Sequence, residues 1–401
     1  MAQIPVAQRA AQIEYAIRDV VVPATELEKQ GHNIIKLNIG DPIAYPGLET
    51  PSHMIRAFQE SLERGENGYS HSYGLPQLRS AISKDETGKG WQCSEDDVYV
   101  CHGVTEALQI IFASTLEEGT KVLAPGPHYP PYMAYPQMYG ASTIEYKLKC
   151  DDGWKLDFSD IEEKMDDSVR LLVLINPNNP TGNVANEEEI KSLISIAEKW
   201  PNCIIIADEI YDGLDFSGTQ VSVASLSNSV PVITLNGVSK VYYAPGWRIG
   251  YLAIHDPQGN MENVRDGLER LLRSRLCAST PAQMGYLAGL EGDKKWMDAY
   301  SEKVITQRDL CIERISKIDG LEVQSPNGAF YMFVRLKDPK WANNDKQFVL
   351  DLLHEEHVLV VHGSGFSPEL GKGHFRIVFL PDIDVLNIAF DRIEQFLLRH
   401  R

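Results

Sequence analysis

Two basic residues near the middle of the chain have the types and the spacing for amine and anion chemistry. An apolar, β-branched run at residues 231–235 predicts a buried strand, which ends in the turn-forming pair Asn236-Gly237. Lys240 follows this turn, and Arg248 comes eight residues later. Burial lowers the pKa of a lysine and makes it a candidate amine nucleophile. An arginine stays charged and can hold a phosphate with two donors.

One ligand needs both groups. Pyridoxal phosphate binds a lysine amine through its aldehyde, as a Schiff base, and requires a partner for its phosphate. The stretch that contains Lys240 and Arg248 therefore predicts a site for this cofactor. At this point one alternative stays open, in which Lys240 is a solvated loop lysine and Arg248 a surface charge, because isolated motif matches carry false positives.

Polar residues at or near other apolar strands suit the same ligand. Asp208 ends the run CIIIAD, and a carboxylate at the end of a buried strand needs a cationic partner, which the pyridinium nitrogen would supply. Tyr211, at the spacing of one helical turn from Asp208, and Asn179 in NPNNPTG could donate to the ring oxygen beside the aldehyde. Arg376 lies inside FRIVF and needs an anion, for which a substrate carboxylate is suitable.

Each of these residues also has a structural interpretation. Asp208 could cap a following helix, and Tyr211 could pack in the core. Asn179 lies in a motif of strong turn formers. Arg376 could form an internal salt bridge. The sequence leaves these alternatives open for each residue taken singly, but all four residues suit one ligand at one edge of one sheet.

A helix start and its surroundings could hold the phosphate. Gly103, Val104 and Thr105 open a predicted helix, whose free N–H groups and positive dipole end attract anions. Ser239 could add a hydroxyl donor. Tyr129 could stack on a flat ring, although aromatic residues in proline-rich loops usually only pack.

Two more residues precede the first long strand. Gly40, in LNIGDP, would let the backbone approach a ligand closely, or it could simply be part of a turn before a proline. Tyr69 lies in a loop, GYSHSYG, where tyrosines usually serve packing or an interface.

The elements that must position these residues follow a repeated order. Apolar strands are predicted at 97–101, 120–124, 169–175, 202–207 and 231–235, and helical patterns such as 186–200 separate the later ones. Such strands indicate an α/β fold with a mostly parallel sheet covered by helices on both faces. The polar residues fall just past the carboxyl ends of the strands, where open α/β sheets bind ligands.

The chain divides into three parts in this interpretation. Residues 1–45 are an N-terminal arm and part of a small domain, residues 46–290 are a large cofactor-binding domain, and residues 291–401 are a smaller α+β domain. The arm is expected to be partly helical over residues 4–17.

Composition excludes several classes of protein. The chain has 401 residues, 43% of them hydrophobic and 23% charged, as in soluble globular enzymes. Its formal net charge of −18 argues against nucleic-acid and anionic-membrane partners. The six cysteines show no C-x-x-C spacing, so we expect no metal site and a cytoplasmic location with reduced thiols. No signal peptide or membrane-spanning run is evident.

The motifs occur in the order of a known family. LNIGDP, GYSHSYGLPQLR, GVTEAL, PGPHYPPY, NPNNPTG, DEIYD, NGVSK, GWRIGY and FRIVF together resemble the class I/II aminotransferases of pyridoxal-phosphate fold type I, over essentially the whole chain. The motifs LNIGDP, VHGSGF and GHFRIVFLP are most similar to the alanine aminotransferase branch.

The resemblance implies a homodimer with active sites at its interface and a role for each residue. The implied roles are the cofactor-bonded lysine (Lys240), the pyridinium partner (Asp208), donors to the ring oxygen (Tyr211, Asn179), the stacking aromatic (Tyr129), the phosphate site (Gly103, Val104, Thr105, Ser239, Arg248), a tyrosine for the neighbouring subunit's phosphate (Tyr69), and substrate contacts (Arg376, Asn179, Gly40). Gly237 stands where some branches have a phosphate-binding serine, and Pro245 where many have threonine.

The expected reaction is transfer of an amino group from L-alanine to 2-oxoglutarate, giving pyruvate and glutamate in ping-pong order. Alternatives on the same fold are an aminotransferase for aromatic, branched-chain or aspartate substrates and a C–S β-lyase. A ligand-sensing regulator, which would carry an added DNA-binding segment, is disfavoured by the short N-terminal arm and the net charge of −18. A dinucleotide oxidoreductase is disfavoured because no G-x-G-x-x-G follows a strand.

Overall fold

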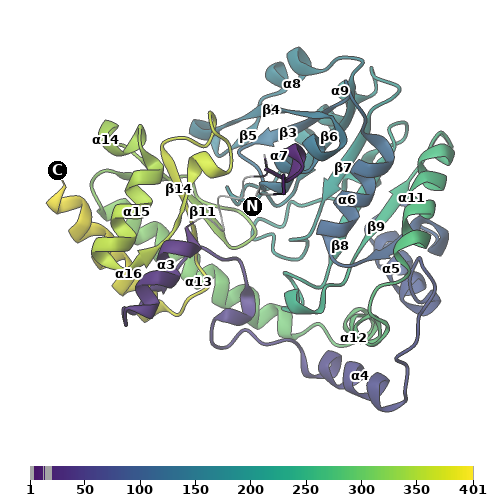
Figure 1. Ribbon diagram of the computed structural model, residues 1–401, viewed down its shortest axis with the longest axis horizontal. Coiled ribbons are helices and arrows are strands. Elements are labelled where there is room, and N and C mark those ends of the chain that lie inside the picture. The colour runs from purple at the N-terminus through teal and green to yellow at the C-terminus, as the bar shows by residue number, and fades with distance from the viewer. Residues whose placement is uncertain (1–3, 12, 14–19, 401) are drawn as a thin grey trace.

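A large sheet forms the centre of the molecule (Figure 1). The computed structural model describes residues 4–11, 13 and 20–400, so part of the predicted N-terminal arm lies outside the described residues. In spatial order the strands of the large sheet are β2 (Val98–Cys101), β9 (Gly250–His255), β8 (Val232–Gly237), β7 (Ile204–Asp208), β6 (Val169–Ile175), β3 (Lys121–Gly126), β4 (Ser142–Lys149) and β5 (Lys155–Leu156).

The large sheet is mostly parallel, as predicted. The neighbours β8, β7, β6, β3 and β4 pair in parallel, whereas β9 runs antiparallel to β2 and β8 and β5 runs antiparallel to β4. Every residue of β7 is buried, and so is nearly every residue of β6 and β8. Continuous apolar character is what a strand covered on both faces requires.

Two strands of this sheet were not predicted. The β4 strand, with the sequence STIEYKLK, alternates charged and apolar residues, and only two of its residues are fully buried. The β5 strand has two residues and pairs with the outer side of β4. The sequence prediction took continuous apolar runs as its signal, and this signal is absent near the edge of a sheet.

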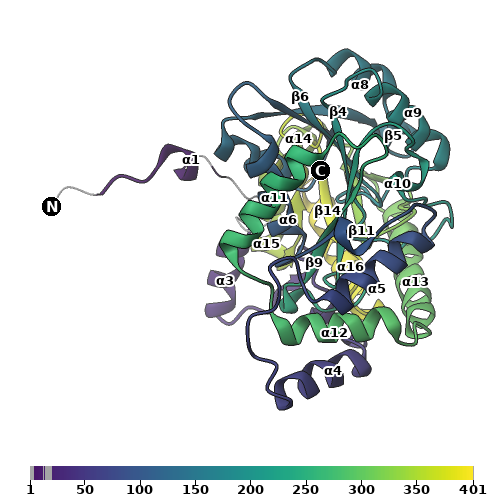
Figure 2. The same cartoon turned by 90° about the vertical axis from the view of Figure 1, so that its right-hand side faces the viewer.

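Helices cover both faces of the large sheet. On one face α6 (Val104–Thr115) and α11 (Glu262–Arg275) pack together over one set of alternating strand residues, which includes Val173, Ile206 and Ile233. On the other face, α8 (Phe158–Lys164), α9 (Glu187–Ala197) and α10 (Val223–Leu226) cover the strand residues that alternate with this first set. Figure 2 shows α11 apart from α9 and α10, on opposite sides of the sheet.

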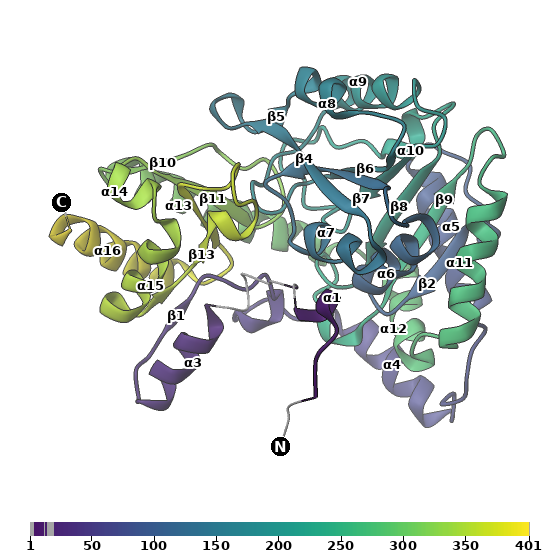
Figure 3. The ribbon, with the colours of Figure 1, turned by 45° about the horizontal axis from the view of Figure 1, so that its top comes forward.

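A second, smaller sheet lies beside the large one (Figure 3). It is antiparallel, with the order β10 (Leu321–Val323), β11 (Tyr331–Leu336), β14 (His374–Val378) and β13 (Val361–His362). The helices of this part are α13 (Trp296–Lys317), α14 (Pro339–Ala342), α15 (Asp345–Glu356) and α16 (Ile383–Arg399). This mixture confirms the predicted α+β character of the C-terminal region.

The beginning of the chain joins the smaller sheet's side of the molecule. The two-residue strand β1 (Ile35–Lys36) pairs in parallel with β12 (Val358–Leu359). The remaining helices are α1 (Gln8–Ala11), α3 (Val21–Lys29), α4 (Ser52–Glu63), α5 (Pro76–Gly88), α7 (Pro131–Ala134) and α12 (Thr280–Glu291). In the part of the chain that the structure describes, none of the helices has both the length and the apolar character that a membrane span requires.

Candidate active site

A cavity of about 460 Å³ opens where β6, β7 and β8 end, and residues of the smaller sheet close its other side. Eleven of the thirteen predicted site residues line it, and only Gly103 and Tyr69 do not. The eleven are Gly40, Val104, Thr105, Tyr129, Asn179, Asp208, Tyr211, Ser239, Lys240, Arg248 and Arg376. The structure therefore brings together residues that lie more than three hundred positions apart along the chain.

Lys240 lies partly buried in this cavity, three residues past the end of β8. Its Nζ donates a hydrogen bond to the carbonyl oxygen of Gly40 at 2.8 Å. Burial, assisted by the nearby charges of Arg376 and Arg248, lowers the pKa of Lys240 to about 8. A substantial fraction of this amine is therefore uncharged near neutral pH, as a nucleophile requires.

Asp208 is the last residue of β7 and is only 3% exposed. Tyr132 of α7 donates its hydroxyl to Oδ2 at 2.8 Å, and the amide of Ile210 donates to Oδ1 at 3.4 Å. Burial raises the pKa of Asp208 to about 6, although Tyr132, Ile210 and the charge of Lys240 oppose the shift. A cation beside this carboxylate would offset its loss of hydration.

The segment that follows Asp208 is a series of turns rather than a helix. The helical spacing predicted for Asp208 and Tyr211 is therefore wrong, and no helix follows for Asp208 to cap. The turn nevertheless brings Tyr211 to the cavity, where its hydroxyl lies 2.9 Å from that of Tyr331 on β11. The backbone hydrogen bond from Leu214 to Tyr211, at 2.8 Å, supports this turn.

Arg376 comes from the middle of β14 and is 1% exposed. Its Nη1 donates to the side-chain oxygen of Asn179 at 2.9 Å, and its Nη2 donates to the backbone carbonyl of Asn38. The rings of Tyr331 and Phe366 lie 4.5 and 4.7 Å from its Cζ. This environment holds the guanidinium in place beside the cavity, where a carboxylate could bind it.

Glycines make room for the anion-binding side of the cavity. Gly103, with φ 76°, precedes α6, and a Cβ there would lie 2.5 Å from Nη2 of Arg248. A Cβ on Gly250 would lie 2.8 Å from the amide nitrogen of Val104. Gly103 therefore does not line the cavity but lets Arg248 lie across the start of α6, beside Thr105.

The sequence departure at Gly237 has a steric cause. A Cβ at this position would lie 2.6 Å from Cα of Gly250 and 2.7 Å from the carbonyl oxygen of Ile249. A serine would not fit without moving β9. Ser239, which is 8% exposed and lines the cavity, is the hydroxyl available in its place.

Tyr69 lies on the surface and takes no part in the cavity of its own chain. Its side chain is 84% exposed. An exposed aromatic residue of this kind is available to another molecule. Tyr132 and Tyr331, by contrast, contact site residues but were not predicted, because aromatic residues in a short helix and a buried strand read as ordinary core.

The donor set fits pyridoxal phosphate. The start of α6, Ser239 and the cation Arg248 suit a phosphate. The buried carboxylate of Asp208 suits a pyridinium nitrogen, and the amine of Lys240 suits an aldehyde. Each chemical group of the cofactor has a complementary group in one cavity, and Arg376 remains for a substrate carboxylate.

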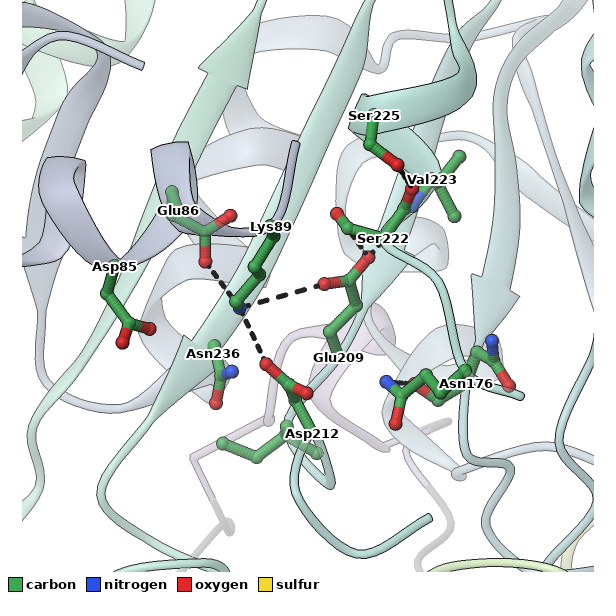
Figure 4. Close-up of polar contacts among 12 residues, drawn as sticks. Asp85, Glu86, Lys89, Asn176, Glu209, Asp212, Ser222, Val223, Ser225 and Asn236 are labelled. Carbon is green, nitrogen blue, oxygen red and sulfur yellow. Dashed lines mark hydrogen bonds and ion pairs between the residues drawn. The ribbon is translucent and has the colours of Figure 1, made fainter. Parts of the chain in front are cut away.

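A second, partly buried ionic group surrounds Lys89 (Figure 4). Lys89, just past α5, lies 2.7 Å from Glu86, 2.7 Å from Asp212 and 3.9 Å from Glu209. Burial alone would lower the pKa of Lys89, but the attraction of the three carboxylates outweighs it and raises this pKa well above its ordinary value.

Glu209 links this ionic group to the next helix. Its Oε1 accepts hydrogen bonds from the hydroxyl of Ser222 at 3.0 Å and the amide of Val223 at 3.1 Å (Figure 4). Burial raises the pKa of Glu209. The segment 208–212 thus presents Asp208 and Tyr211 to the cavity and Glu209 and Asp212 to Lys89.

Known proteins resemble this chain over its full length. It is 34% identical to the glutamate-pyruvate aminotransferase AlaA of Haemophilus influenzae, over 100% of both chains. It is 35% identical to an alanine aminotransferase of Mycobacterium tuberculosis, over 94% of this chain and 89% of that protein. The structure of an alanine aminotransferase from Pyrococcus furiosus matches with a TM-score of 0.96 and 44% identity, over 98% of this chain and 100% of the other.

A family model also covers most of the chain. The match to the model described as aminotransferase class I and II spans residues 32–393. This range includes every residue that lines the cavity. The chain belongs to the class I and II aminotransferases.

Proposed function

We propose that this transaminase moves an amino group between L-alanine and 2-oxoglutarate, giving pyruvate and glutamate in ping-pong order. Members of its family use pyridoxal phosphate. The choice of alanine is supported by the names of relatives that match the whole chain. The observation that carries the assignment of the site is the single cavity in which Lys240, Asp208, Arg248 and Arg376 meet.

We assign the cofactor groups to residues of this cavity. Val104, Thr105, Ser239 and Arg248 hold the phosphate, supported by their position at the start of α6 and the end of β8. Tyr129, which lines the cavity, would offer an aromatic face to the ring. Asp208 keeps a proton on the pyridinium nitrogen, since its carboxylate is buried and receives the hydrogen bond of Tyr132.

The reaction uses Lys240 as its proton carrier. Bound pyridoxal phosphate would supply an electron sink for the electron pair of the substrate Cα–H bond. Arg376 and Asn179 orient the substrate by its α-carboxylate. Lys240 Nζ removes the α-proton as a general base, a role that its lowered pKa favours, and later returns a proton. Tyr211 and Asn179 donate toward the ring oxygen beside the aldehyde.

We also propose a homodimer, a cytoplasmic location and two domains. The exposed ring of Tyr69 supports a role in the partner subunit's phosphate site. Residues 46–290 form the large cofactor-binding domain, whereas residues 1–45 and 291–401 contribute the arm and the small domain. The pairing of β1 with β12 supports placing the end of the first segment with the last one.

A screen of the first half-reaction tests the proposed function. Purified protein loaded with pyridoxal phosphate is mixed with single amino acids, and the cofactor absorbance is followed. We expect L-alanine and L-glutamate to convert the cofactor to its amine form, with pyruvate released from alanine. Conversion by aromatic, branched-chain or aspartate donors but not by alanine would identify one of the alternative aminotransferases. Pyruvate from cysteine conjugates would identify a C–S β-lyase.

A further inference from the structure

A segment of the smaller sheet contacts the large sheet beside the active-site cavity. Residues 363–373, here called the strap, join β13 to β14. The beginning of the strap is anchored locally, because the amide and the hydroxyl of Ser364 donate to the carboxylate of Asp345 at 2.7 and 2.9 Å. The middle of the strap also makes hydrogen bonds to β4 and to the segment that follows β3.

Two hydrogen bonds fix the middle of the strap. The backbone N–H of His128 donates to the carbonyl oxygen of Phe366 at 3.1 Å. The hydroxyl of Ser367 donates to Oε2 of Glu145, on β4, at 2.9 Å. Ser367 and Phe366 are each 1% exposed. Because Phe366 and Ser367 are buried, leaving either of these strap groups without its partner would be costly.

Glu145 also contacts a buried histidine. His128 is 1% exposed, and its Nδ1 lies 2.9 Å from the carbonyl oxygen of Tyr129, which can only accept. Its Nε2 lies 3.2 Å from Oε1 of Glu145. Among the described residues neither Nε2 nor Oε1 makes a hydrogen bond, so each of these buried atoms has its polar contact in the other.

The strap also contacts a residue of the active site. Phe366 lies against the guanidinium of Arg376, with 4.7 Å between Cζ and the ring centroid, and Tyr331 lies against the same guanidinium at 4.5 Å. An aromatic face restricts where a guanidinium can move. Contacts therefore connect Arg376 to Phe366, and the neighbouring Ser367 to Glu145.

We propose that Glu145, with His128 and Ser367, is a positioning group for the substrate carboxylate. It holds the strap so that Phe366 keeps the guanidinium of Arg376 in its binding geometry. This inference rests on the proposed function, and it adds residues that do not line the cavity. Its specific consequence is that these residues control the affinity for carboxylate ligands but not the affinity for the cofactor.

The test uses Glu145→Gln and Ser367→Ala in the full chain loaded with pyridoxal phosphate. The dissociation constant of propionate, a carboxylate that cannot react, is measured by titration calorimetry. We expect propionate to bind about tenfold more weakly in both variants, because Ser367→Ala removes the hydrogen bond and Glu145→Gln removes the charge of its acceptor. KM for alanine and 2-oxoglutarate should rise by about the same factor, with kcat changed less than about threefold, because ground-state binding is affected.

A matched variant separates charge from position. Glu369→Gln makes the same chemical change on the strap, but its side chain is exposed. It should leave propionate affinity unchanged. Hydrogen exchange adds a readout independent of turnover: the His128 amide, which donates to Phe366, should exchange about tenfold faster in Glu145→Gln. Ser367→Ala carries the same test if Glu145→Gln does not fold.

Two results would overturn the proposal. One is propionate affinity within about twofold of the unaltered protein in both variants. The other is a loss of pyridoxal phosphate affinity as large as the loss of propionate affinity, which would make the effect a general structural one. A protein that binds propionate but converts no amino acid contradicts the proposed function alone, and the propionate affinities still decide the role of Glu145.

Discussion

Two partly buried lysines lie on either side of the segment 208–212, and their pKa values are shifted in opposite directions. Lys240 faces the guanidinium groups of Arg376 and Arg248, and its pKa falls to about 8. Lys89 faces Glu86, Asp212 and Glu209, and its pKa rises well above the ordinary value. Both amines have lost water, so the sign of the neighbouring charges makes the difference.

The difference separates a chemical lysine from a structural one. Around Lys240 the charges are of mixed sign, with Arg376 and Arg248 opposed by Asp41 and Asp208, so burial lowers its pKa and makes the neutral, nucleophilic form available. Surplus negative charge around Lys89 keeps it protonated, so that it links α5 to the segment after β7. Burial therefore does not by itself identify a reactive lysine, because three carboxylates reverse its effect on the pKa of Lys89. Substitutions on each side should have effects of different kinds.

Lys240→Ala should have the largest effect. Removal of both the cofactor-bonding amine and the proton carrier should lower turnover by about 10⁴-fold or more. Single-turnover absorbance measurements check this result. The control is Lys84→Ala, which removes an exposed lysine of α5 and should leave turnover unchanged. Turnover within about tenfold of the unaltered protein in Lys240→Ala would contradict the assignment.

Asp208→Asn should lower kcat by about 10²- to 10³-fold, because the pyridinium nitrogen loses its charged partner. The same substitution should make the cofactor-free protein more stable rather than less. The pKa of Asp208 is raised to about 6 by burial, so its ionisation destabilises the fold as pH rises from about 4 through 6. At pH 8 the free energy of unfolding of the variant, measured by urea denaturation, should therefore be about 1–3 kcal/mol higher than that of the unaltered protein.

The matched substitution on the other side is Asp212→Asn. Asp212 lies 2.7 Å from Lys89, so its ionised form stabilises the fold. This variant should be less stable than the unaltered protein at pH 8, with a smaller effect on kcat than Asp208→Asn. Equal signs for the two stability changes would remove the contrast between the two sides of the segment.

Lys89→Met should destabilise the protein by about 3 kcal/mol, since it leaves buried carboxylates without their cation. Part of the loss should return in the double variant Lys89→Met/Glu209→Gln, because Glu209 is almost fully buried. Urea unfolding of the four proteins of this cycle measures the coupling. Additive effects would show that Lys89 does not compensate Glu209.

The smallest effect that we predict is a shift in the pKa of Lys240 in the variant Arg376→Gln. The charge of Arg376 helps to lower the pKa of Lys240, so the variant should move that pKa upward from about 8, by up to about one unit. The rate of reductive methylation at Lys240 in cofactor-free protein, followed by mass spectrometry, should rise with pH through this pKa. An unchanged midpoint would mean that burial alone sets the pKa.

The positions of the site residues were predictable because each has a local signal. Lys240 and Asp208 follow short apolar runs, and the ends of parallel strands converge on one edge of a sheet. Arg376 stood out because an arginine inside an apolar strand needs a partner. These signals depend on only a few neighbouring residues, so they can be recognised without knowledge of the tertiary structure.

What could not be predicted depends on residues distant in sequence. The cluster of Lys89 with Glu86, Glu209 and Asp212 forms only when the end of α5 lies beside the segment that follows β7. The contact of His128 with Glu145 likewise needs β3 and β4 side by side. The β4 strand itself was missed because its exposed side is charged. The sequence around a charged residue does not indicate which partner it will contact in the folded protein.

The most direct test of the central claim is to locate the bonded cofactor. The protein is incubated with pyridoxal phosphate, reduced with borohydride, digested and analysed by mass spectrometry. We predict one modified peptide, which carries the reduced cofactor on Lys240, and no modification of Lys89. Attachment at another lysine with Lys240 unmodified, or no attachment at all, would contradict the account.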